Sequence, residues 1–235
     1  MSVPAATLGP VSDQRLISQF FPVMTAGFPE PAGPDAVVQL HAELLHRICL
    51  ADGLLEVLEW TRQGTGTDAL ACMWLAGLRW HRLVTGSFPA GAPQPPPRQT
   101  DTDLAALLEA GTLRTAASTG TASLAGLSSG ELHYPSAPAQ PGVKDQDVLL
   151  RLTPLALVPY IDEQMRSSWV EQNLAMTHGD TDLLEQGRRL VSAVHQEASA
   201  AEPAPPQPET AAGDHPLFAV VRDLADRWEE VTAAV

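Results

Sequence analysis

The sequence has few cysteines, few aromatic residues and no long apolar run. Its two cysteines, Cys49 and Cys72, lie inside apolar helical patterns, so we expect buried thiols of a reducing compartment and no disulfide framework. No apolar stretch reaches the roughly 18 residues that a membrane span requires. Residues 1–10 do not combine a basic region with an apolar run, so we expect no signal peptide and predict a cytoplasmic protein.

Basic residues are also scarce: 14 Lys and Arg stand against 28 Asp and Glu, which gives a formal net charge of −14. Nucleic-acid backbones and anionic lipids repel such a surface, so we expect neither nucleic acid nor membrane as a partner. Apolar residues, by contrast, make up 44% of the 235 residues. That share is enough for a sizeable buried core and excludes a wholly disordered chain.

Clustered prolines divide the chain into four parts. Residues 1–34 form a Pro-rich segment with room for one short helix at 15–21. Residues 35–197 form a helical domain, 198–213 a flexible linker rich in Ala, Pro and Glu, and 214–235 an amphipathic helix. Because no alternating apolar stretch is long enough to require a strand, the predicted fold class is all-α.

Apolar residues within the domain recur at helical spacing, and short polar residues precede each run as N-caps. Asp35 and Asp162 are each expected to cap a helix, and so are Thr67 or Asp68 and Asp180 or Thr181. Asp101 or Thr102 is expected to cap a shorter helix, and Asp214 the last. The segment 148–158 is almost wholly apolar but contains Pro154, which predicts a buried helix that is kinked or broken. The expected core residues are Leu44, Ile48, Ala51, Leu55, Leu58, Met73, Ala76, Met165, Leu183, Val191, Leu217, Val221, Leu224, Trp228 and the tryptophans Trp60, Trp74, Trp80 and Trp169.

Three segments contain longer and more specific sequence motifs. Residues 50–86 read LADGLLEVLEWTRQGTGTDALACMWLAGLRWHRLVTG, residues 118–127 read STGTASLAGL, and residues 144–189 begin KDQDVLLRLTPLALVP and contain AMTHGDTD. In order, they resemble the helix pair near the start of bacterial ADP-ribosylglycohydrolases, that family's Gly-Asn-Thr helix start, and its Lys-Gly-x-Gly-x-x-Met-Arg segment with the Leu-Thr-His turn. In the first segment, LEW and ACMWLAGLRW particularly resemble the actinobacterial type of the family.

The resemblance implies an orthogonal bundle of α-helices, here incomplete. It also implies two Mg²⁺ ions in a cleft and hydrolysis of the bond that joins ADP-ribose to a protein side chain or a small molecule. The residues at matching ligand-binding positions are Gly120, Thr121, Lys144, Arg151 and His178. No catalytic residue can be assigned by the match.

The metal-binding runs of the family are missing from this sequence. The place of its Thr-Asp-Asp-Thr run is filled by Ala42-Glu43-Leu44-Leu45, and neither its Gly-Asp-Ala-Leu-Gly helix nor a Gly-Asp-x-Asp-Ser/Thr run beyond 214–235 is present. We therefore expect no metal site and no cofactor, and Mg²⁺ only if the family activity survives. Asp145 and Asp147 replace glycines of the phosphate loop, and their carboxylates would repel a diphosphate.

Several residues allow two interpretations. The run Thr177–Asp182 has metal-ligand character, yet a turn with Asp180 as N-cap explains it better. Arg151 is either a ligand contact or a structural ion-pair partner. Glu56, Glu59 and Asp52 are expected on a solvated face.

Three functions remain open. The first hypothesis is a family member that has lost catalysis, a pseudoenzyme that persists as a binding or regulatory protein. The alternatives are an active Mg²⁺-dependent hydrolase completed by unrecognised residues or a second chain, and a non-catalytic module that binds ADP-ribose, an ADP-ribosylated protein or another protein through its last helix. Because family helices are missing at both ends, exposed apolar faces predict self-association.

Overall fold

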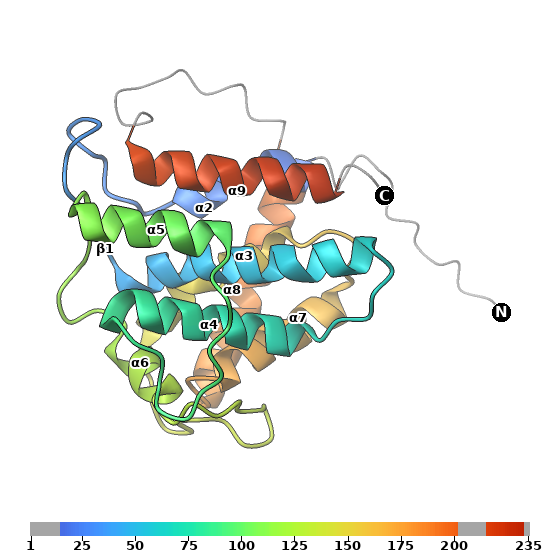
Figure 1. Ribbon diagram of the computed structural model, residues 1–235. Coiled ribbons are helices and arrows are strands. Elements are labelled where there is room, and N and C mark those ends of the chain that lie inside the picture. Colours follow the sequence, from blue (N-terminus) through green and yellow to red (C-terminus); the bar gives the residue numbers. More distant parts are fainter. Residues whose placement is uncertain (1–14, 202–214, 233–235) are drawn as a thin grey trace.

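The computed structural model describes residues 15–201 and 215–232 (Figure 1). Those residues are mostly helical, which confirms the predicted class. None of their helices is long and apolar enough to cross a membrane. The elements are α2 (Phe20–Thr25), β1 (Val38–Leu40), α3 (Ala42–Arg62), α4 (Ala69–Thr85), α5 (Gln99–Ala110), β2 (Leu113–Thr115), α6 (Thr121–Leu127), the 3₁₀ helices η1 (Gln146–Arg151) and η2 (Thr153–Leu157), α7 (Glu163–Ala175), α8 (Thr181–Ala200) and α9 (Pro216–Thr232).

Helix α3 is the central element, with α5 and α9 on one side and α4 on the other (Figure 1). Every residue from Ala42 to Leu55 is buried, including His46, Arg47 and Asp52. A helix buried all round lies in the interior of a fold rather than on its surface. The predicted apolar stripe is therefore correct but covers only part of the buried surface.

The start of α3 differs from the prediction. The helix begins at Ala42, where the ring nitrogen Nδ1 of His41 accepts a hydrogen bond from the backbone N–H of Glu43, so His41 and not Asp35 is the N-cap. The residues just before it, 38–40, form β1, which pairs in parallel with β2. The sequence pattern required no strand at this point, because two three-residue strands from distant segments are too short to show a sequence period.

The other helix ends largely follow their local residues. Asp68, Asp162 and Asp180 accept hydrogen bonds from first-turn N–H groups, as predicted. Helix α5, however, begins at Gln99, and Asp101 lies in its first turn, where its carboxylate accepts from the backbone N–H of Arg98. The N-cap is Arg98, so the predicted cap was placed three or four residues too late.

The prediction for the apolar segment that contains Pro154 is confirmed in form. Residues 148–158 make two short 3₁₀ helices, η1 and η2, which meet at Leu152 just before Pro154. Helix α8 continues to Ala200, so the first residues of the predicted linker are helical. Most of that linker, like Asp214, lies outside the described residues.

Helix α9 packs on its own chain. Its predicted inner residues Leu217, Val221, Leu224 and Trp228 are buried, and the Trp228 ring lies 4.9 Å from that of Phe20 in α2. The helix also contacts α3 and α5. The face expected to attract a partner protein is therefore covered by the body of the molecule.

Two expected core residues are exposed. Trp60 at the end of α3 is 44% exposed and Met165 in α7 is 46% exposed. Helix α7 instead buries Arg166 and Asn173 beside Val170 and Leu174. The apolar pattern alone could not predict this face, because two of its members are polar.

Candidate functional site

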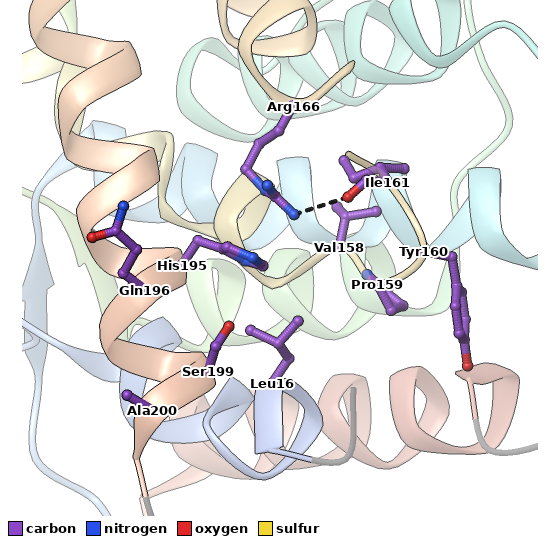
Figure 2. A pocket seen from close by; sticks show the side chains of 10 residues that line it. All are labelled: Leu16, Val158, Pro159, Tyr160, Ile161, Arg166, His195, Gln196, Ser199 and Ala200. Atoms are coloured by element: carbon purple, nitrogen blue, oxygen red, sulfur yellow. Dashed lines mark hydrogen bonds between the residues drawn. The ribbon is translucent and has the colours of Figure 1, made fainter. Parts of the chain in front are cut away.

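A cavity of about 390 Å³ opens between the loop that follows η2, the start of α7 and the end of α8 (Figure 2). None of the five predicted ligand-binding residues lines it. The cavity and the five predicted ligand-binding residues therefore lie in different parts of the molecule.

The structure separates those five residues. Arg151 and His178 come together in the interior, whereas Lys144 and Thr121 are exposed. Gly120 is the N-cap of α6 in a left-handed conformation (φ 66°), where a Cβ atom would lie 2.7 Å from the side chain of Ala42. Gly120 thus permits close packing of α6 against α3, a structural role.

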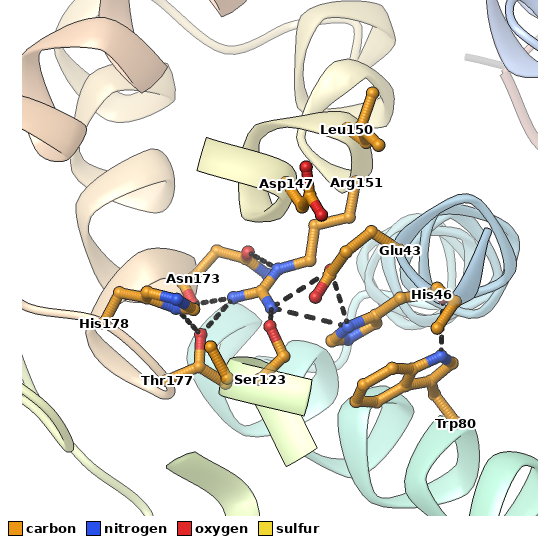
Figure 3. A network of polar contacts seen from close by, with 12 residues as sticks. Glu43, His46, Trp80, Ser123, Asp147, Leu150, Arg151, Asn173, Thr177 and His178 are labelled. Carbon is orange, nitrogen blue, oxygen red and sulfur yellow. Dashed lines mark hydrogen bonds and ion pairs between the residues drawn. The ribbon is translucent and has the colours of Figure 1, made fainter. Parts of the chain in front are cut away.

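Arg151 is the centre of a buried polar network (Figure 3). Its side chain is fully buried, and each guanidinium nitrogen has a partner. Nε donates to Asn173 Oδ1 at 2.9 Å, and Nη2 donates to the Asn173 carbonyl at 2.9 Å and to Thr177 Oγ1 at 2.8 Å. Nη1 donates to Ser123 Oγ at 3.0 Å and lies 3.5 Å from Glu43 Oε2.

Four elements converge on that guanidinium: α3 through Glu43, α6 through Ser123, η1 through Arg151 itself, and α7 through Asn173 and the turn that follows it. Close packing of α6 is required, since a Cβ on Gly126 would lie 2.6 Å from the Thr177 Cα. The network therefore joins segments that are far apart in the sequence.

His46 completes the network on the α3 side. Its ring stacks on Trp80 with centroids 4.2 Å apart and an interplanar angle of 9°. Its Nδ1 lies 3.6 Å from Glu43 Oε2 and 3.5 Å from Arg151 Nη1. Trp80 in turn donates from Nε1 to the carbonyl of Ala42 at 2.8 Å, which fixes the stack at the start of α3.

The charges of this network balance one another. Burial alone would raise the pKa of Glu43, but Arg151 and His46 outweigh it and lower that pKa to about 2. Burial and the Arg151 charge lower the pKa of His46 to about 4, and the same two causes lower the pKa of His178 to about 4. Near neutral pH the network is thus one ion pair with two neutral histidines.

Three buried atoms of the network have no hydrogen-bond partner among the described residues: Glu43 Oε2, His46 Nε2 and His178 Nε2. His178 is held through its other ring nitrogen, which lies 2.8 Å from Thr177 Oγ1. Across residues 15–201 and 215–232, no three His, Cys, Asp or Glu side chains converge as metal ligands would. The donor set does not fit the Mg²⁺ pair that the resemblance implies, because its one carboxylate is paired with Arg151.

The side chains of the predicted phosphate loop are engaged in contacts within the protein. Asp147 lies 3.2 Å from His41 Nε2, and Asp145 accepts from the backbone N–H of Asp147. Lys144 pairs with Asp180 at 3.5 Å and Asp182 at 3.4 Å, and these carboxylates raise the pKa of its ammonium group. The turn interpretation of 177–182 is confirmed, since Asp180 caps α8.

A second polar network joins α3, α4, α5 and α9. Asp52 is fully buried and accepts from Thr100, Arg98 and Arg227. Glu56 and Glu59 pair with Arg79 and Arg98, so expecting all three acids on a solvated face was wrong. The error arose because Arg98 and Arg227 come from segments that the helix pattern of α3 cannot reveal.

Sequence reasoning missed Glu43, His46, Ser123 and Asn173 as partners of Arg151. A signal was present: Glu43 and His46 interrupt an apolar run, and Leu150 and Leu152 flank Arg151. A charge within such a run must find a buried partner, since an unpaired buried charge is costly. Pairing this acid with this base, however, requires the tertiary structure.

Comparison with known proteins adds no relative: neither the family models, nor the curated proteins, nor the solved structures contain a match to this chain.

Proposed function

We propose that this chain is a diverged protein of the ADP-ribosylglycohydrolase type, built on that family's orthogonal helical bundle, and that it no longer removes ADP-ribose. The resemblance of residues 50–86, 118–127 and 144–189 supports the ancestry. All three segments lie within the described helical body. The proposed loss of activity rests on the contacts and charges of the residues at the matched positions.

One observation carries the proposal: every nitrogen of the Arg151 guanidinium is engaged by the protein's own groups. A residue that binds a diphosphate must leave donors open to it, and its charge must not be neutralised in advance. Here Glu43 supplies that counter-charge inside the fold. Asp145 and Asp147 add two carboxylates on the loop where the diphosphate would lie.

The direct test is an assay of hydrolysis. The protein is incubated with an arginine-ADP-ribosylated protein and Mg²⁺, and released ADP-ribose is followed by mass spectrometry beside an active hydrolase of the family. We expect no release above the protein-free blank. Release that EDTA abolishes would show that the chain is an active metal-dependent hydrolase.

Calorimetric titration with ADP-ribose distinguishes a protein that binds ADP-ribose without hydrolysing it from one that no longer binds it. Because Arg151 is engaged internally, we expect no heat of binding up to millimolar ligand, which corresponds to a binding free energy weaker than about −4 kcal/mol. Heat of binding that Arg151→Gln removes, together with no hydrolysis, would instead identify an ADP-ribose-binding protein. Sedimentation of the same sample tests the expected self-association.

A further inference from the structure

Residues 134–143 form a strap across α6 and the turn that joins α7 to α8. None of the strap residues is buried, and none belongs to the apolar core of the described part of the chain. At its middle, the N–H of Ala139 donates to the carbonyl of Ala175, the last residue of α7, at 3.0 Å. A segment with little buried apolar surface separates from a fold at low cost, so the strap is suited to open without the rest of the protein.

The side chain of Gln140 bridges the two structures that lie under the strap. Its Nε2 donates to the Ala122 carbonyl of α6 at 2.8 Å and to the Thr177 carbonyl of the turn at 2.7 Å. The backbone carbonyl of Gln140 accepts from the N–H of Gly179 at 3.0 Å. Each of these bonds is exchanged for a bond to water when the strap leaves, so its net contribution to closure is small.

Gly179 gives the strap its place on the turn. A Cβ atom at Gly179 would lie 2.3 Å from Cγ of Pro138 and 3.0 Å from Cα of Pro141, and the three nearest atoms that it would meet all belong to the strap. Gly179 is not among the glycines with a positive φ, so its backbone accepts alanine without strain. The lack of a side chain at Gly179 therefore serves the contact with the strap.

The turn under the strap carries part of the Arg151 network. Thr177, whose carbonyl bonds to Gln140, also accepts from Arg151 through Oγ1, and Ser123 of α6 accepts from the same guanidinium (Figure 3). Beside Thr177, His178 is 1% exposed, and its buried Nε2 has no hydrogen-bond partner among the described residues. Water that reaches this nitrogen would satisfy it, which lowers the cost of uncovering the turn.

We propose that the strap is a gate over the Arg151 network: it leaves the turn as a unit while the helices stay folded, and it thereby admits water and small molecules to His178. Opening removes the outer connection between α6 and the turn, made by Gln140, and keeps the inner one, made by Arg151. The gate concerns access to the network and does not depend on whether the chain binds or hydrolyses ADP-ribose.

Amide hydrogen exchange of the full-length protein, measured by NMR, tests the opening. The N–H groups of Ala139 and Gly179 bond across the boundary of the strap, whereas those of Thr177 and His178 donate to the Leu174 carbonyl within their own segment. We expect similar protection for the first two and at least about tenfold stronger protection for the second two. Equal protection of all four would show that the strap leaves only with the turn and would overturn the proposal.

Two variants open the gate, and a third is their control. Gly179→Ala displaces the strap by steric contact, and Gln140→Ala removes two of its hydrogen bonds. Each should raise the rate at which diethyl pyrocarbonate modifies His178 by about tenfold, followed by mass spectrometry of peptides. Gly142→Ala, on the strap but with no neighbouring atom of the described residues within 4 Å of the added Cβ, should leave that rate unchanged.

His46 is the internal reference for these rates, since it is equally buried but stacks on Trp80 at the α3 side of the network. Its modification should not change in any of the three variants. An equal increase at His46 and His178 would show general loosening of the fold, and an unchanged rate at His178 in both opening variants would show that the strap does not control access. Either result overturns the gate. If Gly179→Ala does not fold, Gln140→Ala and the exchange rates of the wild type decide.

Discussion

Acid should destabilise this protein through the two histidines beside Arg151. His46 and His178 are each 1% exposed, and the pKa of each is lowered from an ordinary value of 6.5 to about 4 by burial and by the Arg151 charge. The unfolded chain therefore binds more protons than the folded one between pH 6.5 and about 4. The free energy of unfolding is highest above that window and falls as the pH decreases through it.

The size of the loss in unfolding free energy follows from how far the pH lies below the ordinary histidine pKa. At pH 5 the solution lies about 1.5 units below the ordinary histidine pKa, and each unit corresponds to about 1.4 kcal/mol, so each histidine costs about 2 kcal/mol relative to pH 7. Glu43 adds little at pH 5, because its contribution is lost between about 4.5 and about 2. Together the two histidines lower the free energy of unfolding by about 4 kcal/mol, a large part of a typical total.

Urea unfolding at pH 7 and pH 5, followed by tryptophan fluorescence, measures this difference. His46→Gln and His178→Gln should each reduce the pH dependence by about half, whatever they do to stability at pH 7. His133→Gln is the matched control, since His133 lies in the exposed loop near Ser129 and outside the network. Equal pH dependence in wild type and both network variants would refute the reasoning.

Further substitutions test the packing and the ion pairs. Arg151→Met should lower the free energy of unfolding by about 3–5 kcal/mol in urea, because it leaves Glu43 charged and buried, and adding Glu43→Gln should recover part of the loss. Gly53→Ala should lower stability by about 1–3 kcal/mol in thermal unfolding, since its Cβ would lie 2.7 Å from a side chain and 3.0 Å from a carbonyl oxygen of α4. Gly66→Ala, where no neighbouring atom of the described residues lies within 4 Å of the added Cβ, should change it by less than about 1 kcal/mol. Asp52→Asn should cost about 2 kcal/mol or more, because two arginines lose their counter-charge, and an unchanged urea midpoint would contradict that role.

Helix positions were predicted well where local residues control them. Asp68, Asp162 and Asp180 cap the helices that they precede. Pro154 divides the apolar run between η1 and η2. These features depend on hydrogen bonds and backbone angles within a few residues, which the sequence contains in full.

The contacts of the predicted site residues could not be predicted from local sequence, because they involve residues far away along the chain. Arg151 was left open between a ligand contact and an ion-pair partner, and the structure shows the ion pair with Glu43, more than a hundred residues earlier. The cavity beside Arg166 was not predicted at all, since its wall combines Leu16 with residues of η2, α7 and α8.

The sequence by itself thus determined the helical class, the helix ends set by Asp and Pro, and the apolar face of α9. Only the tertiary structure decided which charges meet. An isolated Arg or Glu in an apolar run indicates that a partner exists, but not which one, because a helix brings together residues three or four apart and a folded core brings together any two. That choice pairs Arg151 with Glu43 in the interior, and it leaves the buried Nε of Arg166 without a hydrogen-bond partner among the described residues.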